Sequence, residues 1–103
     1  MVVYGVSQQE AARFGFTTNE GFSGFSAFDV ARNYGKDFAR YCTHQGERPL
    51  IMCHPAVSAQ ADDDIGPARK REFAYLASHD FVQHLADAGV CLVRGSGQAM
   101  PSP

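Results

Sequence analysis

The stretch Leu50-Ile-Met-Cys-His-Pro-Ala56 decides the fold that this sequence predicts. The apolar run from Leu50 to Cys53 is typical of a short buried strand in a parallel sheet. His54 and Pro55 would then lie at the carboxyl end of that strand, where open α/β sheets and barrels place their chemistry. Because histidine can transfer protons near neutral pH, His54 is the candidate catalytic residue. The alternative is a strand-end histidine that only hydrogen-bonds to a loop.

The size and charge of the chain narrow the classes of function. Its 103 residues are enough for one small domain with a single core. Nine basic and eleven acidic residues give a formal net charge of −2, and no basic stripe is present, so we expect no nucleic-acid partner. No apolar stretch approaches the roughly 20 residues of a membrane span, and residues 1–6 lack a charged leader with a long apolar core. We therefore expect a soluble, cytoplasmic protein with no membrane span.

The cysteines and histidines do not have the spacing of a metal site. No Cys-x-x-Cys unit and no pair of histidines four residues apart occurs in the sequence. We expect buried cysteines in a reducing compartment, because two of the three lie in apolar runs. The residues concerned are Cys42, Cys53 and Cys91, with His79 and His84 expected at the surface and His44 in a loop.

Three consecutive aspartates, at positions 62–64, precede a helix-start signal at Gly66-Pro67. They lack the alternating oxygen ligands, central glycine and distal glutamate of an EF-hand loop. The aspartates are therefore expected to form a solvated acidic loop whose charge complements the dipole of the next helix.

Elsewhere the sequence alternates between helical and strand patterns. A short helix is expected over 8–13, a β-leaning segment over 16–19 and a loop over 21–25. Ser26 and Asp29 have the spacing of a capping box, which predicts a helix from Ser26 to about Cys42, with apolar residues on one face and something packed closely at Gly35. Two helices over 67–77 and 78–88 follow, with buried faces at Phe73, Leu76 and Ala77 and at Phe81, Leu85 and Ala88, and then a buried strand over 90–93.

This alternation predicts an α/β fold with about three short parallel strands and three to four helices. Residues 1–95 would form a single partial α/β domain. Residues 96–103, which are rich in turn formers, would form a disordered tail.

Several short segments, in order along the chain, together carry a resemblance. The segments are Thr18-Asn-Glu-Gly-Phe22, Met52-Cys-His-Pro-Ala56, Asp64, Arg69-Lys-Arg-Glu72, Leu76-Ala-Ser78 and Gly89-Val-Cys-Leu92. With these segments the sequence resembles the C-terminal part of the YdjC-like carbohydrate deacetylases, which include chitooligosaccharide deacetylases and deacetylases of hopanoid biosynthesis. The similarity covers roughly residues 15–95.

The resemblance implies the C-terminal third of a (β/α) barrel-type deacetylase. In complete members a divalent metal, Zn or Mg, held by one aspartate and two histidines, activates water against an N-acetyl group on a sugar. The histidine of the Cys-His-Pro motif carries over to His54, which would protonate the leaving amine or orient the active-site network. Arg69 and Glu72 match the Arg-x-x-Glu of the family and are expected in a structural or supporting role.

The chain departs from the family because the N-terminal Asp-Asp motif and the mid-chain His-rich motif, which supply the metal ligands, are missing. We therefore expect no metal site and no cofactor in this chain alone. A barrel fragment would leave strand edges and apolar faces open, so we expect self-association or association with the missing N-terminal part. The surface concerned would include Phe14, Phe16, Phe22, Phe25 and Phe28.

Two hypotheses therefore remain open. In the first, the chain contributes His54 to a carbohydrate deacetylase that acts on N-acetylated sugars. In the second, it is a non-catalytic α/β self-association module.

Overall fold

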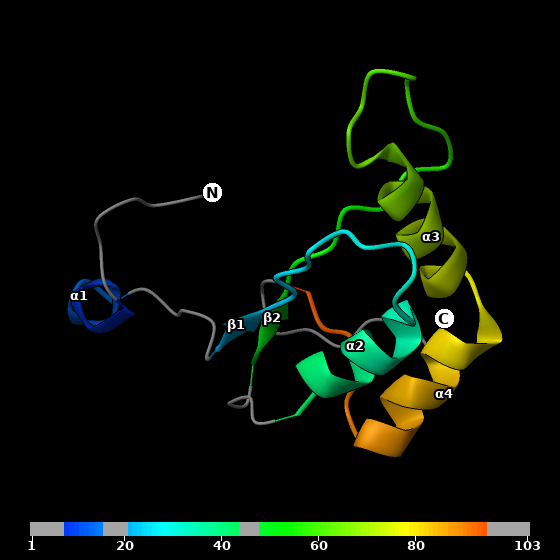
Figure 1. The fold of residues 1–103 in the computed structure, drawn as a ribbon. Coiled ribbons are helices and arrows are strands. Elements are labelled where there is room, and N and C mark those ends of the chain that lie inside the picture. Colours follow the sequence, from blue (N-terminus) through cyan, green and yellow to red (C-terminus); the bar gives the residue numbers. More distant parts are fainter. Residues whose placement is uncertain (1–7, 16–20, 44–47, 95–103) are drawn as a thin grey trace.

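The computed structural model describes residues 8–15, 21–43 and 48–94. The segment 16–19, His44 and the tail over 96–103 lie outside these ranges. The described part is mixed α/β, with four helices and a two-stranded sheet (Figure 1). The elements are α1 (Gln8–Arg13), β1 (Phe22–Ser23), α2 (Tyr34–Tyr41), β2 (Leu50–Ile51), α3 (Gly66–Leu76) and α4 (His79–Ala88).

The two strands pair in parallel, as predicted for the strand that precedes His54. Phe22 lies opposite Leu50 and Ser23 opposite Ile51. The prediction of a loop over 21–25 was wrong, because β1 lies inside it. Of the strand expected over 90–93, the structure shows only an isolated β-bridge at Val93. Val90 packs against the core, but Leu92 and Val93 are exposed. About three strands were expected, and the described residues form two.

Helix α2 begins later than the sequence predicts. Phe28 has a φ of 57°, which a helix cannot contain, so the capping box at Ser26 does not start one. The Ser26 hydroxyl instead accepts a hydrogen bond from the backbone N–H of Phe28, and the Asp29 carboxylate accepts one from Ala31. Both are local turns that compete with helix formation. The cap is Asn33, whose side chain accepts from the Lys36 backbone N–H at 3.1 Å.

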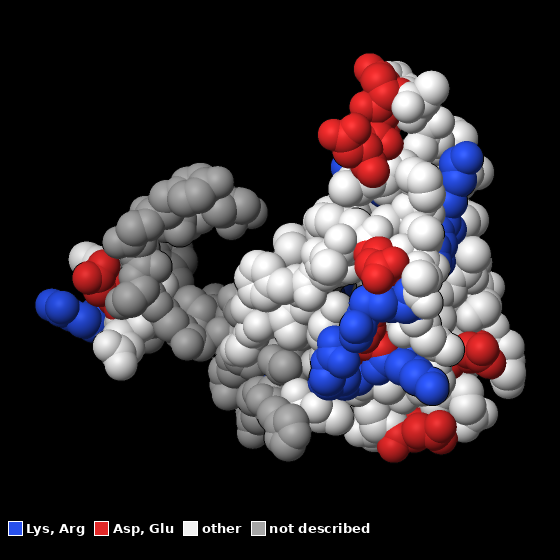
Figure 2. Space-filling view, viewed as in Figure 1, with Lys and Arg blue, Asp and Glu red and all other residues white. Residues whose placement is uncertain are grey.

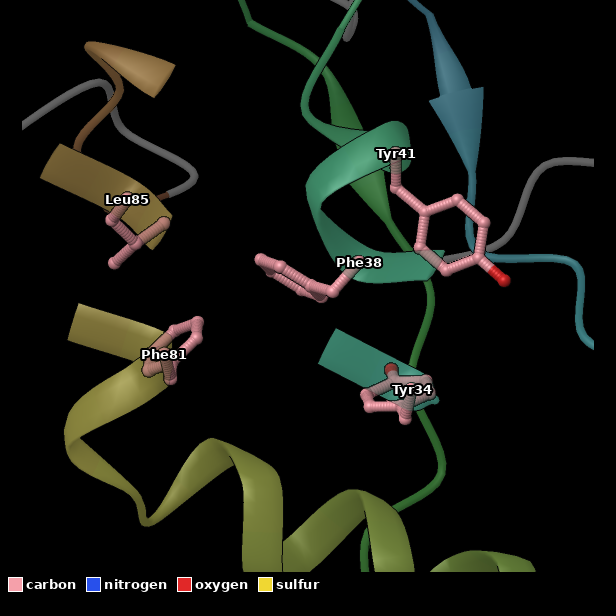
Figure 3. Packing of buried hydrophobic residues seen from close by; sticks show 5 residues of the cluster. All are labelled: Tyr34, Phe38, Tyr41, Phe81 and Leu85. Atoms are coloured by element: carbon pink, nitrogen blue, oxygen red, sulfur yellow. The ribbon is translucent and has the colours of Figure 1, made fainter. Parts of the chain in front are cut away.

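The core lies where α2 packs against α3 and α4. The apolar face predicted for α2 is confirmed by its buried residues Tyr34, Phe38 and Tyr41. Together with Phe81 and Leu85 of α4 they form one cluster (Figure 3). The rings meet edge to face or tilted, as aromatic pairs prefer, for example Phe38 and Phe81 with centroids 5.4 Å apart.

The close packing expected at Gly35 is also confirmed. A Cβ at that position would lie 3.1 Å from a ring carbon of Tyr75 and 3.2 Å from one of His84. His84 itself is half-buried, with Nδ1 2.6 Å from the Tyr75 hydroxyl, so the expectation of a surface residue was wrong for it and right for His79.

Helices α3 and α4 lie close to their predicted ranges, with Ser78 as the N-cap and Gly89 as the left-handed C-cap of α4. The predicted buried face of α3 was right only for Leu76, which is partly buried against the core. Phe73 and Ala77 are exposed, and the buried residues of α3 are Gly66, Ala68 and Glu72. On α4, Ala88 is also exposed.

The cysteines differ from the prediction too. Cys53 and Cys91 are exposed and Cys42 is half-buried, because the apolar runs that hold the first two lie at the edge of a small sheet and beyond α4. The loop before α3 carries the aspartates as an acidic surface (Figure 2), and Asp63 in it is half-buried. No helix among the described residues is long and apolar enough to cross a membrane.

Candidate functional site

His54 and Glu72 meet at the carboxyl end of β2. The chain leaves β2 after Ile51 and reaches His54 three residues later, beside the middle of α3. The backbone N–H of His54 donates to Glu72 Oε1 at 2.9 Å. His54 Nδ1 lies 3.9 Å from the same oxygen. Two of the three residues singled out by the sequence are thus in contact, although they are far apart along the chain.

Glu72 is the most deeply buried large side chain of the described residues, at 1% exposure. Among these residues its only ion-pair partner is His54, and no lysine or arginine reaches its carboxylate. A carboxylate in such surroundings is costly unless it is paired or hydrogen-bonded, so its contacts with His54 matter for both residues.

Four buried polar atoms of the described residues have no hydrogen-bond partner, and two of them belong to His54 and Glu72. They are His54 Nδ1, Glu72 Oε2, the Tyr34 hydroxyl and Arg71 Nε. Burial, and then the negative charge of Glu72, raise the pKa of Tyr34 well above its ordinary range, so Tyr34 remains a neutral phenol. Buried polar groups without a hydrogen-bond partner are rare in native proteins, and they often occur at functional sites.

Aromatic and cationic side chains surround the contact. The Phe28 ring packs edge-on against the His54 ring, with centroids 5.1 Å apart and planes at 80°. The guanidinium of Arg71 lies 5.3 Å from the centre of the Tyr34 ring, a cation–π distance. It also donates to the backbone oxygens of Asp29 and Arg32, which joins α3 to the turn that precedes α2.

Arg69 lies away from His54 and Glu72. Its side chain pairs with Asp63 at 2.9 Å, and its backbone oxygen accepts from the Ala56 N–H at 3.2 Å. Asp63 in turn accepts from the Ile65 backbone N–H, which shapes the entry to α3. Arg69 therefore anchors the acidic loop and the segment after His54.

Tyr34 and Phe28 belong to the site, but the sequence predicted Tyr34 only as part of a helix face and Phe28 as part of a helix face and of the self-association surface. Apolar spacing accounted for Tyr34 as a core residue, and nothing in that pattern distinguishes a core phenol from one beside a carboxylate. The positive φ of Phe28 has no sequence signal, because such a conformation is uncommon for a bulky residue.

The residues present do not fit the divalent metal that the family resemblance implies. No group of three or more His, Cys, Asp or Glu side chains that could hold a metal ion occurs within the described ranges. A catalytic zinc usually takes three protein ligands. His54 and Glu72 supply two groups, and one of Glu72's oxygens is already used by a backbone N–H.

A second charged cluster lies on the face shown in Figure 2, over the start of α2. Buried Asp37 accepts two bonds from the Arg32 guanidinium, at 2.6 and 3.0 Å, and lies 3.1 Å from Arg40. The hydrogen bond from Arg32, aided by the charge of both arginines, lowers the pKa of Asp37. Because its charges are paired with one another, this cluster is a structural clamp.

Comparisons with protein-family models, with curated proteins and with solved structures find no significant match to this chain.

Proposed function

We propose that this chain is the C-terminal part of a metal-dependent deacetylase of N-acetylated sugars, with a (β/α) barrel fold, and that it contributes His54 to the active site. The metal ligands would come from the N-terminal part of the barrel, which would also be the chain's partner. The three free cysteines support a reducing, cytoplasmic setting for it.

The observation that carries the proposal is the contact between His54, at the carboxyl end of β2, and the buried carboxylate of Glu72. Both residues belong to the motifs on which the family resemblance rests. The position of His54 also suits catalysis, since a histidine at the carboxyl end of a parallel strand can reach a substrate bound at that end of the sheet. Its task would be to give a proton to the amine that leaves when the N-acetyl bond breaks.

The chain alone should not perform the reaction. We expect no stoichiometric zinc binding in calorimetric titration and no acetate release from chitobiose, because a metal site of three ligands cannot be assembled from the described residues. Tight zinc binding with turnover that His54→Ala abolishes would contradict the fragment interpretation.

The decisive test is complementation. This chain would be co-expressed with the first two thirds of a chitooligosaccharide deacetylase of the YdjC-like family, and the complex isolated and assayed for acetate release from chitobiose. We expect a metal-dependent activity that His54→Ala lowers by about 10²–10⁴-fold at unchanged metal content.

Arg69→Gln is the matched control, because Arg69 pairs with Asp63 and does not touch His54. It should change stability more than turnover. A complex that forms and releases no acetate would refute the deacetylase function. Failure of the two parts to associate would refute the barrel fragment.

The second candidate is a non-catalytic self-association module. The observation that favours it is the apolar surface around the sheet, where Phe22, Phe25 and Leu50 are 45%, 71% and 50% exposed. In this case the chain alone would form a stable oligomer, and His54→Ala would change its stability but no activity. The variant keeps the backbone N–H that donates to Glu72 and loses the contacts of the imidazole with the Glu72 carboxylate and with the Phe28 ring.

A further inference from the structure

The environment of the His54 ring differs at its two nitrogens. Nδ1 is buried and lies 3.9 Å from Glu72 Oε1, which is too long for a hydrogen bond. The side chain as a whole keeps 23% of its surface exposed. Because Nδ1 itself is buried, this exposed surface belongs to the other atoms of the side chain.

The carboxylate discriminates between the two neutral forms of this ring. If Nδ1 carried a lone pair, that lone pair would face the negative charge of Glu72, and Nδ1 would be buried without a donor. If Nδ1 carries the proton, the N–H points its positive end at the carboxylate. In a buried, low-dielectric setting the second arrangement is strongly favoured.

Contacts with neighbouring residues fix the position of the Glu72 carboxylate beside the imidazole. Its Oε1 already accepts the backbone N–H of His54, so the carboxylate and the histidine backbone move as one unit. The edge-on Phe28 ring limits rotation of the imidazole. Tyr34 lies close enough for the charge of Glu72 to affect its hydroxyl, and it stays neutral, so it does not compete as a second negative charge.

We propose that Glu72 is a positioning residue that fixes His54 in the tautomer with the proton on Nδ1, which leaves the lone pair of Nε2 for the substrate. The role of this lone pair in deacetylation rests on the proposed function: Nε2 takes up a proton during water attack and delivers it to the leaving amine. The tautomer assignment itself does not depend on that function.

The test is nitrogen NMR on the isolated, uniformly ¹⁵N-labelled chain at a pH where the imidazoles are neutral, without sugar or metal. Long-range proton–nitrogen correlations show which ring nitrogen carries the proton. We expect His54 to show a protonated Nδ1 and an unprotonated Nε2. The opposite assignment in the wild-type chain would overturn the proposal without any variant.

Glu72→Gln keeps the size of the side chain and an oxygen to accept the His54 backbone N–H, but removes the charge. It should lower the ratio of the two His54 tautomers by about five- to tenfold, because it removes the negative charge that lies 3.9 Å from Nδ1 in a buried setting. The His84 signals report whether the variant is folded, since His84 lies against Tyr75. An unchanged tautomer ratio in the folded variant would refute the role of Glu72.

Tyr75→Phe is the matched control. It removes the hydroxyl that lies 2.6 Å from His84 Nδ1 and should alter the His84 signals while leaving those of His54 unchanged.

In the complemented deacetylase, Glu72→Gln should lower kcat by about tenfold with little change in KM. The expected tautomer with no acetate release would refute only the deacetylase function. Acetate release with the opposite tautomer would refute only the positioning role.

Discussion

Two buried carboxylates in this chain, Asp37 and Glu72, have opposite kinds of partner. Asp37 is clamped by two arginines that are themselves largely exposed. Glu72 has a backbone N–H and an imidazole, and no arginine or lysine among the described residues pairs with it. Because two arginines neutralise its charge, Asp37 has a structural role. The charge of Glu72 is only partly paired, so it can act on His54.

The Asp37 clamp predicts how stability depends on pH. Its pKa is lowered in the folded state, chiefly by the hydrogen bond from Arg32, so folding favours the ionised form. The stabilisation is present above the unfolded pKa, about 3.9, and is lost as the pH falls through the lowered folded value.

A double-mutant cycle with Asp37→Asn and Arg32→Gln, measured by urea unfolding, tests this dependence. The coupling free energy between the two residues should be favourable at about pH 6 and smaller at about pH 3, because the stabilisation declines once the pH falls below the unfolded pKa of Asp37. A coupling of equal size at both pH values would show that the clamp does not depend on the charge of Asp37.

At the level of elements, the chain after β1 passes very close to the chain after β2. A Cβ on Gly24 would lie 2.2 Å from the Met52 carbonyl oxygen and 2.7 Å from its nitrogen, and Gly24 has a φ of 96°. Both the close backbone contact and the left-handed conformation require glycine.

Gly24→Ala should therefore lower the free energy of unfolding by on the order of 3 kcal/mol, from backbone strain plus the clash. Gly89→Ala is the control, since Gly89 is also left-handed but has open space around it, and it should cost about 1 kcal/mol. Chemical denaturation of the two variants measures the difference. Equal losses would mean that the contact with Met52 is not restrictive.

The sequence predicts elements well where local signals agree with the tertiary structure. Pro67, Ser78 and Gly89 mark the ends of α3 and α4, and each acts there as its residue type suggests. The apolar run before His54 correctly predicted a parallel strand, but the strand covers only Leu50–Ile51 and is not fully buried, since Leu50 is 50% exposed.

The wrong predictions have a physical cause, because they depend on backbone conformations and tertiary contacts that a local sequence pattern does not encode. The capping signal at Ser26 was overridden by the positive φ of Phe28. The burial of α3 follows Glu72 and Ala68 instead of Phe73, because the helix turns its carboxylate toward the His54 backbone. Sequence reasoning could nominate Glu72 through a motif, but its burial and its contact with His54 needed the tertiary structure.

For the whole molecule, the most unusual feature is the amount of aromatic surface left open. Phe25 is 71% exposed, and its ring packs against that of Phe22, which is itself opposite exposed Leu50. Phe14 is 76% exposed on the turn after α1, and Phe16 lies outside the described residues. Apolar side chains gathered at the edge of an open sheet are typical of an interface.

We therefore predict that the isolated chain self-associates at micromolar concentration and that Phe25→Ser shifts the equilibrium toward monomer by about tenfold or more, as expected for the loss of a buried aromatic anchor. Val57→Ser is the control, because Val57 is 75% exposed but lies in the loop before α3. Sedimentation velocity over a concentration series measures both. A compact wild-type monomer throughout the series would contradict the prediction.

The parallel pairing of β1 and β2 also sets an order of assembly. Parallel strands must be joined by a crossover, here the segment that contains α2, so the sheet can close only after a long loop has been brought together. Helices α3 and α4 are separated by only two residues and can meet early. The amide of Leu50 donates to the Gly21 oxygen and the amide of Met52 donates to the Ser23 oxygen. We expect these two hydrogen bonds to form last and to open first to solvent exchange. Their opening would expose the strand that leads to His54 before the helical core is lost.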